Sequence, residues 1–180
     1  VDLTYLQERF SALAAQVLEA WEASGHASED VDMPVMLSQA MSQLIDLLNH
    51  IQDEQHDGKS EAAEINTLCG YGLHLVEELS QLAAGLDQRG LAAEIEQLSL
   101  PFASWFARHG GEIKLLAPVV NALAYFANQS SNPQAMAILY SQCCELIEAT
   151  SPACEDSAAN DPGHPWRLLL LNRAIVATRS

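Results

Sequence analysis

One polar face of a predicted helix carries two carboxylates and two histidines at helical spacing: Asp46, His50, Asp53 and His56. A carboxylate three residues before a histidine is a motif of di-iron sites in helical bundles. Such sites take two copies of this motif and carboxylates from two further helices, whereas this chain has one copy. The face also points away from the apolar residues of the same helix. We therefore expect no metal site here, and no cofactor is predicted for the protein.

The other reactive groups do not have the arrangement of a catalytic site. Glu77 and Glu78 are neighbours in a helix, so their carboxylates point about 100° apart instead of facing each other across a cleft. Cys154 is followed by two acidic residues, which raise rather than lower the pKa of a thiol. The sequence also lacks a phosphate-binding glycine loop and the common hydrolase motifs. We therefore predict no catalytic residues.

A mixed polar face offers a better candidate for binding. It carries an aromatic ring, an imidazole, a carboxylate and an amide at positions i, i+3, i+7 and i+10: Tyr71, His74, Glu78 and Gln81. Tyrosine is enriched in protein interfaces, and this face lies opposite an apolar stripe. We predict that Tyr71, His74 and Glu78 contribute to a partner-binding groove. The alternative is that Tyr71 only packs over a neighbouring helix.

Two apolar series predict the pair of antiparallel helices that must position this face. The first comprises Leu73, Val76, Leu79, Leu82, Ala83 and Leu86, and the second Ala92, Ile95, Leu98, Phe102, Trp105 and Phe106. Arg89-Gly90 is expected to end the first helix, because glycine adopts the left-handed conformation and a cation favours a helix C-terminus. One hairpin cannot bury both stripes, so other helices must pack beside it.

The rest of the chain predicts five further helices. Thr4 and Gln7 form a capping box for the first, and Asp32 caps the second. Gly110-Gly111 separates the central pair from a helix over residues 112–128. Asn132-Pro133 begins the next helix, in which proline occupies the first helical position. A loop over residues 151–165 precedes a final helix that begins near Trp166.

The course of the chain is open at two places in the central pair of helices. Gly70 and Gly72 lie inside a helical pattern, where each costs about 1 kcal/mol relative to alanine. They mark either a break near Tyr71 or a close approach by a neighbouring helix. Pro101 lies inside the second series of the central pair, so that helix must either kink or restart there.

Composition and pattern together predict an all-α fold. Leucine and alanine supply most of the 49% apolar residues, and runs of β-branched residues are scarce. We expect about seven antiparallel helices in a single domain over residues 1–180, arranged as stacked hairpins or, alternatively, as an irregular bundle. The expected hairpins cover residues 4–57, 60–109 and 112–149, and residues 164–180 begin another. Because the last helix has no stop signal, we expect the natural chain to continue past Ser180.

Spacings between residues 79 and 145 resemble the tetratricopeptide repeat (TPR). One copy comprises Leu79, Leu82, Ala83, Leu86, Gly90, Ile95 and Phe102, and the other Val119, Ala122, Leu123, Phe126, Met136, Tyr140 and Cys143. Ile95 and Met136 replace a small residue of the family, and its closing proline is absent. The resemblance implies a short α-solenoid whose concave groove binds a peptide or partner helix. It would place groove residues near Glu77, Ser80 and Asp87.

The charge narrows the class of partner. The net charge is −16, and residues 1–100 carry 18 acidic against three basic side chains, which leaves −15 for that part. Such a field repels nucleic acid and anionic lipid, and it either favours a basic partner or simply keeps the protein soluble. No membrane helix or signal peptide is visible, and four cysteines without a C-x-x-C spacing favour the reducing cytoplasm.

These observations favour an adaptor module that binds another protein through an acidic surface, by way of a basic or amphipathic segment. Two alternatives belong to other classes. One is an acidic decoy that occupies the nucleic-acid site of a DNA-binding protein, which requires carboxylates spaced like phosphates. The other is an enzyme whose site is assembled from scattered residues, which requires a deep pocket lined by His74, Glu78 or another buried titratable group.

Overall fold

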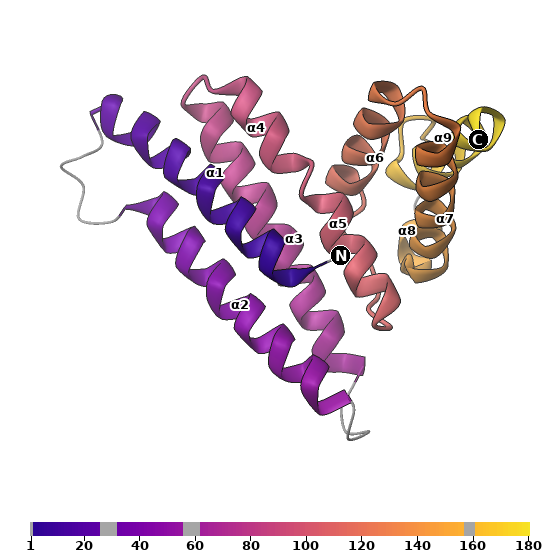
Figure 1. Ribbon diagram of the computed structural model, residues 1–180, viewed down its shortest axis with the longest axis horizontal. Coiled ribbons are helices and arrows are strands. Elements are labelled where there is room, and N and C mark those ends of the chain that lie inside the picture. Colours follow the sequence, from indigo (N-terminus) through magenta and orange to yellow (C-terminus); the bar gives the residue numbers. More distant parts are fainter. Residues whose placement is uncertain (1, 26–31, 56–61, 157–160) are drawn as a thin grey trace.

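The computed structural model describes residues 2–25, 32–55, 62–156 and 161–180, and these are organised as an all-α fold (Figure 1). The helices are α1 (Leu3–Ala23), α2 (Met33–Gln55), α3 (Ala62–Gly85), α4 (Arg89–Glu96), α5 (Ser99–Arg108), α6 (Ala117–Gln129), α7 (Pro133–Ala149), α8 (Pro152–Asp156) and α9 (Pro165–Arg179). The all-α prediction is confirmed. The described residues contain more than the expected seven helices because the fourth is divided and a short α8 lies within the predicted loop.

The first three helices lie side by side, and α4 packs against α1 and α3 (Figure 1). α1 buries one stripe, as predicted: Leu3, Leu6, Phe10, Leu13, Ala14, Val17 and Trp21. The prediction that Thr4 caps this helix is wrong. The Asp2 carboxylate accepts a hydrogen bond from the Thr4 amide at 2.9 Å, and a carboxylate at this position also interacts favourably with the helix dipole.

α3 runs through both of its internal glycines without a break, so the second alternative for Gly72 is the correct one. A Cβ at Gly72 would lie 2.9 Å from Cδ2 of Leu44 on α2 and 3.6 Å from Cε2 of Phe106 on α5. Both neighbouring side chains are buried. The absence of a side chain at Gly72 therefore lets α2 and α5 approach α3 closely. Gly70 has open space around it.

The turn after α3 differs from its prediction. Arg89-Gly90 does not end α3, because Arg89 is the first residue of α4. Asp87 instead takes the left-handed conformation with φ 61°, and the amides of Asp87 and Gln88 donate to the carbonyls of Ala84 at 3.0 Å and Ala83 at 2.9 Å. This is a Schellman motif with aspartate in the position that glycine usually occupies.

The predicted helix around Pro101 restarts rather than kinks. α4 ends at Glu96, and α5 begins at Ser99, which places Pro101 in a first turn where its missing amide hydrogen is not needed. α5 then buries three aromatic side chains in the core: Phe102, Trp105 and Phe106. It contacts α3 on one side and α6 and α7 on the other.

The break at Gly110-Gly111 is confirmed, but the helix predicted to begin at residue 112 starts only at Ala117. Gly110 has φ 78°, and the Gly111 amide donates to the Phe106 carbonyl at 2.8 Å. Ile113 then pairs with the end of α7: its amide donates to the Ala149 carbonyl at 2.8 Å, and its carbonyl accepts from the Ser151 amide at 2.9 Å. This isolated parallel bridge and the full burial of Ile113 favour extended backbone over helix.

The C-terminal helices do not pack as the hairpin predicted for residues 112–149. α7 contacts α9 and α5 extensively and α6 only slightly, while α9 also packs on α6. The TPR resemblance is not confirmed, because α6 and α7 make few contacts and the second helix of the other copy is interrupted between Glu96 and Ser99. Asn132 caps α7 as predicted, by accepting from the Gln134 amide at 3.0 Å.

Candidate functional site

The residues predicted to bind a partner share the outer surface of α3. Tyr71, His74 and Gln81 are exposed, and Glu78 is half-buried. The imidazole of His74 lies between two carboxylates: Nε2 is 3.3 Å from Oε1 of Glu78, and Nδ1 is 3.6 Å from Oε2 of Glu77. The structure thus brings His74 and Glu78 together and adds Glu77 to the group.

The helical spacing explains this triad, because positions i+3 and i+4 both lie next to position i on a helix surface. The two carboxylates do not face each other, as predicted, but both reach the imidazole from one turn away. A neutral imidazole has one N–H, so both contacts are attractive only when the ring is protonated. His74 has 58% of its side chain exposed, which makes this group a surface cluster and not a buried acid–base pair.

A narrow cleft of about 230 Å³ lies beside this surface, between α3, the end of α4 and the start of α6. Its lining comprises Val76, Glu77, Ser80, Gln81, Glu96, Ala117, Pro118 and Asn121. The Ser80 hydroxyl donates to the Ala92 carbonyl at 2.9 Å, which ties α3 to α4. The Asn121 amide donates to Oε1 of Glu96 at 2.9 Å, which ties α6 to α4. We refer to the eight lining residues, Val76, Glu77, Ser80, Gln81, Glu96, Ala117, Pro118 and Asn121, as the acidic cleft.

The lining of the acidic cleft combines two carboxylates with apolar residues. Glu77 and Glu96 supply the charge, and the described residues that line the cleft include no lysine or arginine. The apolar lining residues are Val76, Ala117 and Pro118, of which Ala117 is exposed. Such a combination suits a side chain with a hydrocarbon stem and a cationic end. The TPR resemblance predicted groove residues near Glu77 and Ser80. No sequence pattern predicted Glu96 or Asn121 as site residues, because their position in the cleft depends on how α4 and α6 pack.

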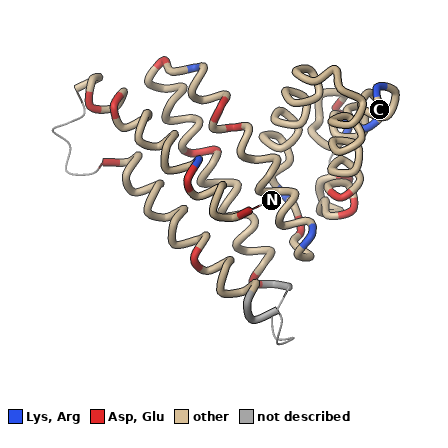
Figure 2. The backbone as a smooth tube through the Cα atoms, viewed as in Figure 1, with Lys and Arg blue, Asp and Glu red and all other residues tan. Residues whose placement is uncertain are grey.

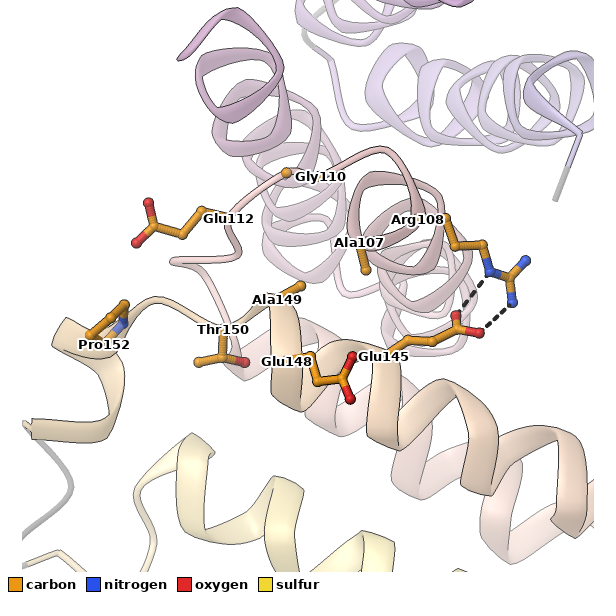
Figure 3. A pocket seen from close by; sticks show the side chains of 10 residues that line it. Ala107, Arg108, Gly110, Glu112, Glu145, Glu148, Ala149, Thr150 and Pro152 are labelled. Atoms are coloured by element: carbon orange, nitrogen blue, oxygen red, sulfur yellow. Dashed lines mark hydrogen bonds and ion pairs between the residues drawn. The ribbon is translucent and has the colours of Figure 1, made fainter. Parts of the chain in front are cut away.

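A larger cavity of about 420 Å³ lies where α5 ends, beside residues 110–112 and the end of α7 (Figure 3). Arg108 donates to both carboxylate oxygens of Glu145, from Nε at 2.9 Å and from Nη2 at 3.3 Å. Figure 3 shows this pair on one side of the cavity and Glu112 on the other. The charge of Arg108 is therefore already balanced, and this cavity offers no free cation to an anionic ligand.

An apolar groove of about 360 Å³ lies between α1, α5, α6 and α7. Its lining comprises Tyr5, Leu100, Pro101, Phe126, Ser130, Ala135, Ile138, Leu139 and Gln142. The acidic cleft, the cavity at the end of α5 and the apolar groove all lack the groups expected of an acid–base site. Their described lining residues include no histidine and no buried carboxylate. His74 and Glu78, two of the groups that the enzyme alternative named, lie on an outer surface and not in a deep pocket.

Burial favours the neutral form of three thiols, those of Cys69, Cys143 and Cys154. Burial raises the pKa of Cys69 to about 12, and burial followed by the neighbouring Cys144 raises the pKa of Cys143 to about 11. The pKa of Cys154 is also raised, first by burial and then by Glu112. The predicted direction for Cys154 is correct, but the responsible carboxylate comes from the segment before α6 and not from its chain neighbours. Raised thiol pKa values oppose nucleophilic reactivity.

The metal motif is only partly described. Asp46 and His50 lie exposed on α2, whereas the side chains of Asp53 and His56 lie outside the part of the chain that the structure describes. Among the side chains that are described, no group of three or more histidines, cysteines or carboxylates is placed to hold a metal ion. The described helices also include none with the length and apolar character required to cross a membrane.

Comparisons with protein families, with curated proteins and with solved structures found no match to this chain.

Proposed function

We propose that this protein is an adaptor that binds a basic segment of a partner protein in the acidic cleft. The observation that carries the proposal is that Glu77 and Glu96 both line one cleft whose described lining has no basic residue. A lysine or arginine of the partner would lay its stem on the exposed Ala117 and place its cationic end near these carboxylates. Tyr71, His74 and Glu78 on the adjoining surface of α3 would contact the flanking residues of the bound segment.

The charge of the whole chain supports this choice of partner. Residues 1–100 carry −15 of the net −16, and acidic residues are spread along α1 to α4 (Figure 2). Such a field draws cationic segments toward this half of the molecule and speeds their association. The electrostatic field does not fix where a cation binds, whereas the acidic cleft provides a defined position for one cation.

The experiment compares two variants that have the same net charge. One removes the charges of the cleft (Glu77→Gln with Glu96→Gln), and its matched control removes two exposed charges from α1 (Glu8→Gln with Glu22→Gln). Glutamine at residue 96 keeps the acceptor for Asn121, so the fold is preserved. Binding of a fluorescent lysine-rich peptide is measured at about 50 mM and about 500 mM NaCl.

We expect the cleft variant to bind the peptide about tenfold more weakly than the control variant at low salt, because a directly paired charge is worth more than a distant one. Binding to the wild type should weaken steeply at high salt. Equal affinities for the two variants would show that the peptide responds only to net charge, and would contradict a role for the cleft.

A further inference from the structure

The apolar groove between α1, α5, α6 and α7 differs in charge from the acidic cleft and from the cavity at the end of α5. The acidic cleft has two carboxylates in its lining, and the cavity has three. The described lining of the apolar groove contains no charged residue. The groove therefore fits a ligand of another kind than a basic segment.

Several apolar side chains that line this groove are open to solvent. Ile138 is 63% exposed and Tyr5 is 57% exposed, while Phe126 and Pro101 are half-buried. Ala135 lies one turn before Ile138 on the same face of α7, and its small side chain takes little of the space in the groove. A ligand that covers these groups removes apolar surface from water, which favours binding.

Two polar side chains of the lining retain hydrogen-bonding capacity. Gln142 donates from Nε2 to Oγ of the fully buried Ser104 at 3.3 Å, and among the described residues no group donates to its Oε1. Oγ of Ser130 accepts from the Asn132 amide at 3.3 Å, so its hydroxyl proton is still available to a partner. The lining thus offers one acceptor and one donor beside its apolar surface.

The size and the neutral lining of the groove define the class of ligand. Pockets for small molecules measure about 300–1,000 Å³ and combine a mostly apolar lining with a few polar groups. The groove, of about 360 Å³, lies at the lower end of this range. An ion that left water here would meet no opposite charge in the described lining, which makes its burial costly. A small uncharged molecule avoids this cost.

The aromatic residues of the lining favour an aromatic ligand. Tyr5 and Phe126 both line the groove, and the Phe126 ring makes an edge-to-face contact with Tyr125 in which the ring centroids are 5.6 Å apart. Aromatic rings pack against one another in offset-stacked or edge-to-face pairs. A flat ring is also the shape that adds the most apolar contact for few rotatable bonds.

We propose that the apolar groove is a binding site for a small uncharged aromatic molecule that carries an N–H or O–H donor. The ring of the ligand would cover the exposed surface of Tyr5, Phe126 and Ile138, and its donor would bond to Oε1 of Gln142. The site goes beyond the acidic cleft, because it lies between other helices and takes a ligand of another chemical class.

Two other occupants fit the observations less well. The row of groove residues on α7 lies between polar Asn132 and charged Glu145, so a partner helix of about 10–14 residues, about 15–21 Å long, would extend beyond the apolar surface. A second copy of this chain would bring together two molecules of net charge −16. The experiment below distinguishes both occupants from a small molecule.

The test titrates the whole protein with indoles and follows its backbone amide signals by NMR. Skatole and N-methylindole are isomers, of which only skatole has an N–H donor. Tryptophol, tryptamine and indoleacetate differ mainly in charge, being neutral, cationic and anionic. The variants are Ala135→Phe, which fills the groove, and Gln142→Leu, which removes the acceptor. Ala137→Phe is the matched control, since Ala137 is exposed on α7 and does not line the groove. Circular dichroism confirms that each variant folds.

We expect skatole to bind the wild type with a Kd at or below about 1 mM and to shift the amide signals of the groove residues. Ala135→Phe should weaken this binding at least about tenfold, whereas Ala137→Phe should retain it. N-methylindole should bind the wild type about five- to tenfold more weakly than skatole, and Gln142→Leu should abolish this difference. Comparing two ligands within one variant cancels any change in its stability. Tryptamine and indoleacetate should bind at least about tenfold more weakly than tryptophol.

Binding of the lysine-rich peptide to the acidic cleft should be the same in Ala135→Phe as in the wild type, so the two proposals fail or succeed separately. The proposal for the groove is overturned if skatole binds the wild type no more tightly than Ala135→Phe, or if a charged indole binds as tightly as tryptophol. It is also overturned if sedimentation shows a dimer that Ala135→Phe dissociates, or if a leucine-rich helical peptide binds the groove more tightly than every indole.

Discussion

At the scale of single residues, the two internal glycines of α3 have opposite surroundings. A Cβ added at Gly70 would meet no atom within 4 Å, whereas one at Gly72 would lie 2.9 Å from a methyl group of the buried Leu44. Both residues are helical, so both bear the same conformational cost relative to alanine. Only Gly72 has a packing reason that outweighs this cost.

Alanine substitutions should therefore separate the two positions. Gly70→Ala should raise the free energy of unfolding by about 0.5–1 kcal/mol, because it adds only helix propensity. Gly72→Ala should lower it by about 1 kcal/mol or more, because Leu44 must move within a packed core. Urea unfolding of the two variants measures both effects. A gain in stability at both positions would show that Leu44 relaxes freely and that α2 does not need the close approach.

The buried thiols predict a loss of stability at high pH. The pKa values of Cys69 and Cys143 are raised from the ordinary 9.0 to about 12 and about 11. Above pH 9 the unfolded chain releases these protons while the folded chain retains them, so stability present at neutral pH is lost as the pH rises. Each thiol should cost on the order of 1 kcal/mol at about pH 10.

The predicted loss of stability at high pH is tested by measuring the free energy of unfolding in urea at about pH 8 and about pH 10. The double variant Cys69→Ala/Cys143→Ala is the control. The two proteins differ only at residues 69 and 143, so the difference between the two pH dependences belongs to these thiols. The control should be less stable at neutral pH but should lose less stability on raising the pH. Parallel pH dependences would contradict the assigned role of burial.

At the scale of elements, two left-handed turns set the directions of α4 and of the segment after α5. One places Asp87 at φ 61°, and the other places Gly110 at φ 78°. The side chain of Asp87 is highly exposed, and its 3.7 Å contact with Arg89 is an exposed ion pair that contributes little. Aspartate therefore bears a backbone cost that glycine would avoid.

Exchanging the residue types at these turns should change stability in opposite directions. Asp87→Gly should stabilise the protein by up to about 1 kcal/mol, because glycine takes the left-handed conformation without steric cost. Gly110→Ala should destabilise it by about 1 kcal/mol for the same reason. Thermal unfolding followed by circular dichroism compares both variants with the wild type. Destabilisation by Asp87→Gly would mean that the aspartate side chain supports the turn in a way that outweighs its backbone cost.

At the scale of the whole molecule, the concentration of negative charge opposes folding. Residues 1–100 carry −15 of the net −16, and acidic residues lie along all four of the helices α1 to α4 (Figure 2). The ion pair of Arg9 with Glu94, at 2.8 Å between α1 and α4, is exposed and offsets little of this repulsion. Screening should therefore stabilise the protein.

We expect the free energy of unfolding to rise by on the order of 1 kcal/mol between about 0.05 M and about 0.5 M NaCl. Sodium chloride is chosen over sulfate so that screening, and not exclusion of the salt from the protein surface, dominates. Glu8→Gln/Glu22→Gln should show a weaker salt dependence than the wild type. If salt instead lowers the free energy of unfolding, the ion pairs stabilise the folded protein by more than the repulsion between its acidic side chains destabilises it.

The sequence by itself determined the helices and their buried stripes, because the apolar periodicity of a helix and its caps are local properties. The stripe of α1, the break at Gly110-Gly111 and the cap at Asn132 were all predicted from neighbours in the chain. The exposed triad around His74 also follows from spacing alone. The type and approximate position of most elements therefore did not depend on the tertiary structure.

The tertiary structure decided which helices meet and what lies between them. Ile113 was expected in a helix, but two hydrogen bonds to the distant end of α7 and full burial hold it extended. α7 packs mainly on α9 and only slightly on α6, and Glu77 and Glu96 line one cleft only because α4 and α6 pack beside α3. These contacts join residues far apart in the chain, and their free energy comes from burial that no local pattern encodes.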